Sequence, residues 1–518
     1  MQVGTNSIER LKAEKDGLDI QSEIEELAAQ HGGWETMDAP TRERLKWIGT
    51  FYRKPTPGQF MMRIRITGGQ ATSDQLRALA AISRRQGNGI LDITTRQQIE
   101  LRAIQISSVP GILEAMEGVD LSSLQTGMDN VRNVNTCPLS GLTNAELLDA
   151  APVGEELTRL FLNNKEFTNL PRKFNVTITG CLENCTHTET QDVGMTPAVR
   201  RSDGFPGFNV AVGGKMGSGG MTIAQPLNVF VEPHEAAALT GAIILLFRDE
   251  GSREQRSRAR LAFLVEDWGI ERFRAELERR WGKPLQAAGR DVRLATHTDH
   301  LGVEKQQQSG LWSVGLCVLT GRVNGEHLEE LARLADTYGS GHVRLTPAQN
   351  AVLVNVPEQR LPTLLAEPLL KELSPQAHSF TRGMVTCIGT DYCNLALIET
   401  KTTGRDLAER LAERFPLAEP LTMHWSGCPA GCGNHQAADI GFQGTKARID
   451  GEVVDAVSIF VGGQTGPNAR PAEMLMDLVP VTMLDDVMPL LISNLETLKK
   501  VRRVPEAEES VLMVPALP

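Results

Sequence analysis

The spacing of apolar residues along the chain predicts units made of a strand, a helix and a second strand. The strand-like run MMRIRI (61–66) leads through a glycine turn into TSDQLRALAAI (72–82), where Leu and Ala recur as they do on one face of a helix. A second strand-like run, ILDITT (90–95), follows. The runs VGLCVL (314–319) and HVRLT (342–346) flank a similar helical pattern later in the chain. Strands and helices that alternate in this way predict mixed α/β layers.

These elements belong to an internal repeat with a period of about 250 residues. The helical patterns correspond at an offset of 252 residues, which aligns Leu76 with Leu328. The motif TGCLENC (179–185) corresponds to SGCPAGC (426–432), and a VGG turn follows each copy. Because several stretches match in the same order, we expect a duplicated, pseudo-twofold body with a large ligand in the crevice between its halves.

Composition narrows the classes of function. The 518 residues are 41% hydrophobic and 23% charged, which is typical of a globular chain. The formal net charge of −11 argues against nucleic acid as the main partner, because phosphate binding needs a basic surface. No apolar run is long enough to span a bilayer, so we expect no membrane partner. The polar N-terminus has no apolar stretch typical of a secretory signal, which predicts a cytoplasmic protein.

Four cysteines in the second half form two close pairs. Cys387 and Cys393 lie in CIGTDYC, and Cys428 and Cys432 lie in GCPAGCGN. Four thiolates in two pairs are typical of a cubane iron–sulfur cluster, and the neighbouring glycines let the backbone approach it. A zinc site is the competing interpretation, although structural zinc sites favour a tighter C-x2-C spacing. Purely structural thiols are the third interpretation.

The first half keeps three of these cysteines. Cys137, Cys181 and Cys185 occupy the repeat-related positions, whereas Thr143 stands at the position aligned with Cys393. Because a cluster needs four ligands, we interpret this set as a degenerate relic. The remaining cysteine, at position 317, lies within a strand pattern and is expected to be a buried core thiol.

Longer motifs surround the cysteines, and together they resemble those of the sirohaem-dependent nitrite and sulfite reductases, above all the ferredoxin–nitrite reductases. These motifs include WETMDAPTRERLKWIGTFYRK, QFMMRIR, ITTRQ, GMDNVRN, NLPRKFN, GFNVAVGG and HWSGCPAGCGN, and they cover nearly the whole chain. The resemblance implies an α/β (α+β), internally duplicated pseudo-twofold body. It implies, in order, an N-terminal helical lead (1–55), a ferredoxin-like half-domain (56–128), an α/β reductase domain (129–290), a second ferredoxin-like half-domain (300–376) and a second α/β domain that carries the cluster (377–518).

The resemblance also implies the cofactors and the residues that bind them. The [4Fe–4S] cluster would be held by Cys387, Cys393, Cys428 and Cys432, and Cys432 would also be the axial ligand of a sirohaem iron. The residues that match the substrate-binding motifs are Arg63, Arg132, Lys173 and Asn175. Because sirohaem carries eight carboxylates, its pocket must be rich in cations and N–H donors. The matching macrocycle positions are Arg65, Arg96 and Arg102, with Thr94, Gln97, Gln349, Asn350 and the VGG turns as weaker candidates.

One short motif bears on the substrate. In this family K-x-N accompanies nitrite and K-x-K accompanies sulfite, and this chain has Lys173-Phe174-Asn175. The loss of one ammonium suits a monoanion, so we expect an enzyme that reduces nitrite to ammonia with six electrons. Reduction of sulfite to sulfide on the same scaffold is the alternative. A non-catalytic Fe–S or zinc protein is the distant alternative.

The sequence lacks a binding motif for an internal electron source. No G-x-G-x-x-G fingerprint follows a strand and opens a helix, so the chain is not expected to take hydride from a nicotinamide. An external one-electron donor is implied, and the resemblance suggests ferredoxin or flavodoxin. The basic segment Arg248–Lys283 is a candidate docking patch for this donor. We expect the enzyme to be a monomer.

Overall fold

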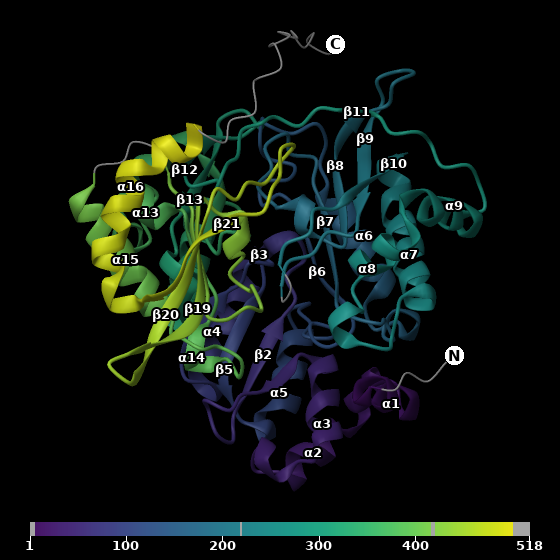
Figure 1. Ribbon diagram of the computed structural model, residues 1–518, viewed down its shortest axis with the longest axis horizontal. Helices are drawn as coiled ribbons and strands as arrows, with labels where there is room; N and C mark the ends of the chain where they lie inside the picture. Colours follow the sequence, from purple (N-terminus) through teal and green to yellow (C-terminus); the bar gives the residue numbers. More distant parts are fainter. Residues whose placement is uncertain (1–5, 218–219, 416–419, 501–518) are drawn as a thin grey trace.

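A computed structural model describes residues 6–217, 220–415 and 420–500. The first five residues of the expected helical lead, and residues 501–518 of the last expected domain, lie outside this described part. The described chain forms four β-sheets with helices packed on their faces (Figure 1). Two sheets, called the small sheets below, have mostly short strands, and the other two, called the large sheets, include longer strands. The prediction of a mixed α/β, internally duplicated body is confirmed by this arrangement.

The two small sheets contain the strand–helix–strand units that the apolar pattern predicts. The first sheet has the order β1 (Thr50–Tyr52), β2 (Phe60–Ile64), β5 (Ile99–Ile104), β4 (Ile90–Ile93) and β14 (Arg322–Asn324). The second has the order β12 (Gly302–Lys305), β13 (Leu311–Leu316), β16 (Ala351–Pro357), β15 (His342–Leu345) and β3 (Gln70–Thr72). The two sheets therefore repeat the same strand order.

Each small sheet takes its last strand from the other half of the chain. Strand β14 pairs antiparallel with β4, and β3 pairs antiparallel with β15. The helices that follow the exchanged strands, α4 (Ser73–Gln86) and α10 (Gly325–Tyr338), pack against each other. A single apolar core extends through both units. The two ferredoxin-like half-domains expected from the sequence are thus interlocked parts of one packed body.

Matching caps begin these two helices. In α4 the side chain of Thr72 accepts the N–H of Gln75, and the Gln75 side chain accepts the N–H of Thr72. Asn324 and His327 make the same reciprocal pair at the start of α10. Both pairs satisfy N–H groups that a helix start leaves without partners. The repeat found in the sequence is therefore also a repeat of local structure.

The two large sheets have the same mixed topology. The first has the order β10 (Gln225–Val231), β9 (Pro206–Val212), β8 (Val193–Val199), β7 (Phe174–Ile178) and β6 (Val131–Asn135), with β11 (Arg290–Asp291) paired to β8. The second has the order β17 (Met384–Thr386), β18 (Met423–Ser426), β19 (Ile440–Ile449), β20 (Glu452–Val461) and β21 (Glu473–Pro480). In each sheet the first three strands along the chain are parallel and the later ones are antiparallel.

Helices cover the outer faces of the large sheets (Figure 1). Those of the first half are α6 (Ala151–Phe161), α7 (Pro233–Glu250), α8 (Leu261–Trp268) and α9 (Ile270–Trp281). Those of the second half are α13 (Ser379–Arg382), α15 (Lys401–Arg414) and α16 (Leu484–Lys500), whereas α14 (Gly389–Tyr392) lies beside β5, where Tyr392 packs against Arg102. The remaining helices are α1 (Ser7–Glu14), α2 (Ile24–Gln30), α3 (Ala39–Arg44), α5 (Val109–Glu117), α11 (Leu361–Leu365) and α12 (Leu369–Glu372). No helix in the described part of the chain is long and apolar enough to cross a membrane.

The N-terminal helices are held to the body by a buried charge. Lys12 of α1 is 8% exposed and forms ion pairs with Glu9 and with Asp129, which precedes β6. Its ammonium also donates to the carbonyl of Leu170 at 2.8 Å. Burial lowers the pKa of Lys12, and the two carboxylates oppose this effect. The helical lead is therefore anchored on the first large sheet.

Candidate active site

The turns after two neighbouring strands bring the second-half cysteines together. Cys387 follows β17, and Cys393 follows α14. Cys428 and Cys432 lie in the turn after β18, which is parallel to β17. Because the carboxyl ends of parallel strands meet at the same edge of a sheet, both cysteine pairs lie at that edge.

Backbone N–H groups point at two of these sulfurs. The Sγ of Cys387 accepts the N–H of Gly427 at 3.1 Å and that of Gly389 at 3.5 Å. The Sγ of Cys393 accepts the N–H of Leu395 at 3.4 Å. Such N–H groups stabilise negative charge on sulfur and are found around iron–sulfur clusters.

The electrostatics of the four thiols show that they are neighbours. Burial, and then negative charge on Cys432, raises the pKa of Cys387 to about 11. Burial also raises the pKa of Cys428, and charges on Cys432 and Cys393 add to the effect. Thiolates this close repel one another unless a cationic centre binds them. The arrangement fits the metal-bound state that the sequence predicts.

Basic side chains of the first half face Cys432, the exposed member of the four. Arg96 lies in the turn between β4 and β5, and Lys173 directly precedes β7. Burial, and then the charge of Arg63, lowers the pKa of Arg96 to about 10. Burial, and then the charges of Arg260 and Arg96, lowers the pKa of Lys173 well below its usual value. A thiolate at Cys432 opposes both shifts, so the second-half cysteine lies within electrostatic range of both cations.

The predicted substrate residues lie around the same cations. Arg132 of β6 is 7% exposed, and burial followed by the charges of Arg63 and Arg96 lowers its pKa well below the usual value. Lys173 and Asn175 are two residues apart along an extended segment, which places their side chains on the same side. The structure therefore gathers all four predicted substrate residues and Arg96 near one another.

Several polar atoms of this group have no hydrogen-bond partner among the described residues. One Arg132 nitrogen donates to the carbonyl of Met128 at 2.7 Å, whereas its other terminal nitrogen, Nη1, is buried and unpaired. The buried Oδ1 of Asn175 is also unpaired. Buried polar atoms that lack a partner are costly, so these atoms fit contacts to a bound polar group.

Two predicted macrocycle arginines are bound by the protein itself. Arg102 is 1% exposed and lies between Asp92, at 2.6 Å, and Glu100, at 2.5 Å. Arg65 donates to the main-chain carbonyls of Val131 and Arg132 at 3.1 and 2.9 Å, which fixes the start of β6. Both side chains therefore position other residues of the site.

The predicted amide and hydroxyl side chains close turns beside the site. The Gln349 amide donates to the carbonyls of Ile93 and Thr386 and accepts the N–H of Thr386, so its hydrogen bonds are made within the protein. Asn350 accepts the N–H of Val318 at 2.9 Å through Oδ1, while its buried Nδ2 has no partner in the described part of the chain. Thr94 Oγ1 accepts the N–H groups of the turn that carries Arg96. Gln97, the repeat mate of Gln349, donates to three carbonyls.

Sequence reasoning missed Arg260 as part of this group. Its guanidinium is 8% exposed and forms two bonds to Asp192, at 3.0 and 2.7 Å. The same carboxylate accepts the main-chain N–H of Asn175 at 2.8 Å. Arg260 thus holds the strand that carries Asn175, and its charge acts on Lys173. A signal in the sequence is the recurrence of Asp192-Val-Gly as Asp439-Ile-Gly in the second repeat, whereas Arg260 itself lies within the Arg248–Lys283 segment and no motif marks it.

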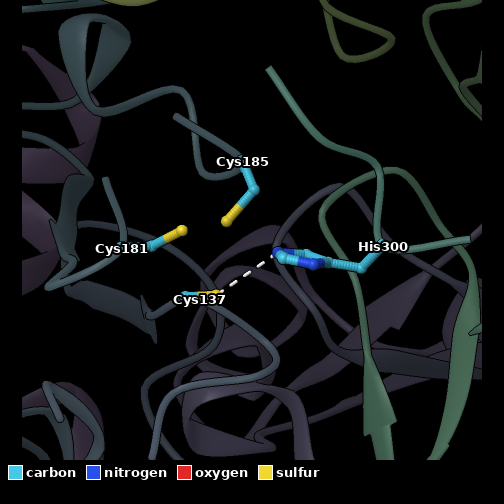
Figure 2. A group of neighbouring side chains, drawn as sticks. All are labelled: Cys137, Cys181, Cys185 and His300. Atoms are coloured by element: carbon cyan, nitrogen blue, oxygen red, sulfur yellow. Dashed lines mark hydrogen bonds between the residues drawn. The ribbon is translucent and has the colours of Figure 1, made fainter. Parts of the chain in front are cut away.

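A second thiol group lies in the first half (Figure 2). Cys137, Cys181 and Cys185 are joined there by His300, and the ligand atoms of all four lie within 4.8 Å of one another. The sequence-based interpretation of a three-ligand relic is wrong in its premise, because a fourth ligand is present. His300 lies 163 residues from Cys137 in the chain and outside the repeated motif, so no local spacing predicted it.

Comparison with known proteins explains this architecture. The family description "Nitrite and sulphite reductase 4Fe-4S domain" matches residues 127–285 and 377–502, and "Nitrite/Sulfite reductase ferredoxin-like half domain" matches residues 52–119 and 304–371. The chain belongs to the nitrite and sulfite reductase family. Within this family, the chain is 47% identical to the ferredoxin–nitrite reductase of Synechococcus elongatus, over 93% of this chain and 95% of the relative.

Other members of the family are similar over comparable lengths. The chloroplastic ferredoxin–nitrite reductase of Zea mays is 40% identical, over 94% of this chain and 88% of the relative. The solved structure of the Mycobacterium tuberculosis NirA protein matches with a TM-score of 0.90 at 30% identity, and covers 97% of this chain and 95% of that chain. The predicted family and fold are thus confirmed.

The described residues fit the cofactors that this family implies. Four neighbouring thiols and the N–H groups aimed at their sulfurs suit a [4Fe–4S] cluster. Beside them, burial and then the charges of neighbouring arginines lower the pKa values of Arg96, Arg132 and Lys173, so these cations suit a partner with additional negative charge. A polycarboxylate macrocycle would supply the missing negative charge.

Proposed function

We propose that this chain is a ferredoxin-dependent nitrite reductase that converts nitrite to ammonia. Nitrite takes up six electrons and eight protons in this reaction and yields ammonium and two waters. The observation that carries the proposal is the position of Cys432. It is the exposed cysteine of the four, and it lies within electrostatic range of the half-buried cations Arg96 and Lys173 of the other half. A sulfur in this position is suited to join a cluster to a cofactor held between the halves.

We assign the cofactor contacts from this geometry and from the family motifs. The four second-half cysteines would hold the [4Fe–4S] cluster, and Cys432 would also connect this cluster to a sirohaem. Sirohaem, when bound, supplies an iron that can pass electrons to an anion. Arg96 contacts the macrocycle carboxylates, whereas Arg65 and Arg102 position the strands around it through the carbonyls and carboxylates that they bind. Thr94, Gln97, Gln349 and Asn350 fix the turns beside it.

Four side chains of the first half bind and protonate the substrate in this proposal. Arg132 offers a fixed cationic fork, and its buried Nη1 has no partner among the described residues. Lys173, with a lowered pKa, can release a proton to a reacting oxygen and take one up again. Arg63 is held by Glu100 at 2.7 Å and adds positive charge. Asn175 contributes a neutral amide, which suits a monoanion better than a second ammonium would.

Ferredoxin, or flavodoxin in its place, is the proposed electron donor. The Arg248–Lys283 segment is a poor docking patch, because Arg253, Arg256 and Arg280 pair with carboxylates of the protein. We instead place the donor around Leu395, which is 68% exposed and directly follows the Cys393 turn. Exposed Lys54 lies beside it and donates its main-chain N–H to Asn394 Oδ1. A basic, apolar surface next to the cluster suits an acidic carrier.

The cellular setting and assembly follow the same proposal. The eight cysteines of the chain are free thiols, which suits the reducing cytoplasm. We propose a monomer, because each half of the chain supplies one side of the site and no second copy is needed to complete it.

A spectrum and an assay of steady-state turnover test the function. The purified holoenzyme should show the absorption bands of an iron tetrapyrrole and reduce nitrite with reduced methyl viologen. Lys173→Ala and Arg132→Ala should each lower kcat by at least a hundredfold while the bands remain, because each removes a charge next to the reacting oxygens. The matched controls are Lys446→Ala and Arg405→Ala, which remove exposed cations and should leave kcat unchanged.

Two results would contradict the proposal. A protein with iron and sulfide but no tetrapyrrole bands would exclude both reductase functions. A holoenzyme that turns over sulfite faster than nitrite would identify the alternative enzyme on the same scaffold.

Nitrite turnover that both active-site variants retain would refute the roles assigned to Lys173 and Arg132.

A further inference from the structure

Three segments of the first half bring metal-binding side chains to one buried point. Cys137 follows β6, Cys181 and Cys185 lie in the turn after β7, and His300 lies between β11 and β12. Their exposed fractions are 0%, 1%, 6% and 2%. The His300 ring points toward the three sulfurs, and its Nε2 lies 3.4 Å from Cys137 Sγ (Figure 2).

We propose that these four residues bind a structural zinc ion. Three cysteines and one histidine are a ligand set that structural zinc sites use. With zinc–sulfur and zinc–nitrogen bonds of about 2.3 and 2.0 Å, the ligand atoms of a tetrahedral site stand roughly 3.5 Å apart. The separation of 3.4 Å between Cys137 Sγ and His300 Nε2 matches this edge. The site goes beyond the proposed function, because reduction of nitrite does not require it.

The same spacing argues against a second iron–sulfur cubane. A cubane distributes its four ligands over four separate irons, so the ligand sulfurs must stand farther apart than those around a single ion. All four ligand atoms here lie within 4.8 Å of one another, and among the described residues this is the one group of His, Cys, Asp and Glu side chains so close. The repeat-related cysteines of the second half do not form such a compact group.

The histidine has the surroundings of a zinc ligand. Its Nε2 faces the sulfurs, while its other nitrogen, Nδ1, lies 3.6 Å from a carboxylate oxygen of Glu304. Histidines that bind metals usually direct their second N–H toward a carboxylate or carbonyl, which fixes the tautomer. Within the described chain Nδ1 has no hydrogen-bond partner, so its N–H remains available to the carboxylate of Glu304.

The backbone around His300 is built for this placement. His300 has a φ of 56°, a conformation that few residues other than glycine adopt, and its N–H donates to Thr298 Oγ1 at 3.1 Å. Its carbonyl lies so close to Gly315 of β13 that a Cβ at Gly315 would overlap it. Because the contacts with Thr298 and Gly315 hold this strained backbone in place, the His300 ring is kept pointing toward the thiols.

The surroundings of the sulfurs favour a single closed ion. The three cysteines pack in one apolar cluster with Leu139 and Val352, and none of them is more than 6% exposed. Three thiolates in such a place would be very unfavourable without a cation, and zinc would deprotonate the thiols and offset two of the three negative charges. A closed site with four protein ligands has no open position for catalysis and is typical of structural zinc.

The proposed ion would fasten the connection between the two halves of the chain. The segment that carries His300 leads from the first large sheet to the second small sheet, and the three cysteines come from the first large sheet. Nearby, Leu294 donates its N–H to the carbonyl of Leu182, and Gln307 donates its N–H to the carbonyl of Leu142. A zinc ion would link His300 on this segment to the three cysteines of the first large sheet.

Elemental analysis and X-ray absorption of the purified holoenzyme test the proposal. We expect about one zinc per chain in addition to the iron of the proposed cofactors. The zinc-edge spectrum should show three sulfur ligands at about 2.3 Å and one nitrogen ligand at about 2.0 Å. This measurement uses the unmodified protein, so it does not depend on whether a variant folds.

Variants then connect the ion to its ligands. Cys185→Ser and His300→Ala should lose zinc while iron content and tetrapyrrole bands remain. The matched control is Cys317→Ser, which removes a buried thiol outside the site and should keep zinc. Less than a tenth of a zinc per chain in protein with full iron would overturn the proposal, as would zinc that survives both substitutions. Extra iron and sulfide that disappear with Cys185→Ser would also overturn it, in favour of a second cluster. Missing tetrapyrrole bands would count against the proposed enzyme alone.

Discussion

Replacing Asp92 with asparagine should destabilise the protein more than any change of a surface charge. Asp92 lies in β4 and is 1% exposed. Its carboxylate pairs with Arg102 at 2.6 Å, with Arg322 at 3.0 Å and with Lys401 at 3.3 Å. These cations come from the first small sheet, from the exchanged strand β14 and from α15. One buried carboxylate therefore joins three parts of the chain.

The size of the expected loss in stability follows from the buried cations that would remain after the negative charge of Asp92 is removed. Asparagine keeps the shape of the side chain but removes the negative charge that faces three cations. Lys401, which is 2% exposed, would keep the carbonyl of Thr320 and the hydroxyl of Thr386 but would lose the negative charge that its ammonium faces. Neutralising one partner of a buried ion pair costs about 3–5 kcal/mol, so we expect the free energy of unfolding to fall by about that amount.

Urea denaturation followed by circular dichroism measures this difference. The control is Asp406→Asn, which removes a carboxylate that pairs with Arg405 at the surface and should cost less than about 1 kcal/mol. The double variant Asp92→Asn with Lys401→Met should recover part of the loss, because it also removes the uncompensated ammonium. If Asp92→Asn were no less stable than Asp406→Asn, the inferred role of the buried carboxylate would be refuted.

The same group makes the protein sensitive to acid. Burial alone would raise the pKa of Asp92, but Lys401, Arg102 and Arg322 together lower it far below its usual value. The pKa of Glu100 is likewise lowered, to about 2, against the effect of burial. Carboxyls with lowered folded-state pKa values stabilise the protein fully above their unfolded values near 4, and this stability is lost as the pH falls toward 2. The wild type should therefore lose more stability between pH 4 and pH 2 than Asp92→Asn does.

Three further changes test other parts of the structure. Asn175→Lys should raise the ratio of sulfite to nitrite kcat/KM at least tenfold, because a second ammonium favours a dianion; an unchanged ratio would count against this role. Gln349→Ala should lower the free energy of unfolding by about 1–3 kcal/mol, since it leaves buried main-chain groups unpaired, whereas exposed Gln376→Ala should have little effect. Gly180→Ala should prevent accumulation of folded protein, because its Cβ would overlap a main-chain carbonyl, whereas Gly111→Ala meets open space and should be tolerated; equal yields of both variants would contradict the packing described.

The sequence predicted much of the fold because the signals were local or repeated. Strand and helix periodicity located the small units, and the match between Leu76 and Leu328 revealed the duplication. The exchange of β3 and β14 was not predictable in this way. Each exchanged strand is only three residues long, and its partner lies far away in the chain. Such pairing depends on tertiary packing and leaves no trace in the pattern of apolar residues.

The predictability of the site residues depends on the same distinction between local and long-range signals. Residues within compact motifs, such as Cys428 and Lys173, can be proposed from the sequence because their spacing is meaningful by itself. Arg260 and His300 were missed because their roles depend on segments that the fold brings in from elsewhere. Arg102 was found by its motif, but its two carboxylate partners could not be inferred from sequence, and they determine what its charge can still bind.

The exchange of β3 and β14 also affects how the protein is made. Strand β4 leaves the ribosome well before β14, which completes the edge of its sheet and lies more than 200 residues downstream. Until β14 is synthesised, the first small sheet therefore has an unpaired edge strand, which can pair incorrectly with other chains. Synthesis of the second half ends this exposure. Mutual strand donation also means that neither copy of the duplicated unit can complete its small sheet without a strand from the other copy.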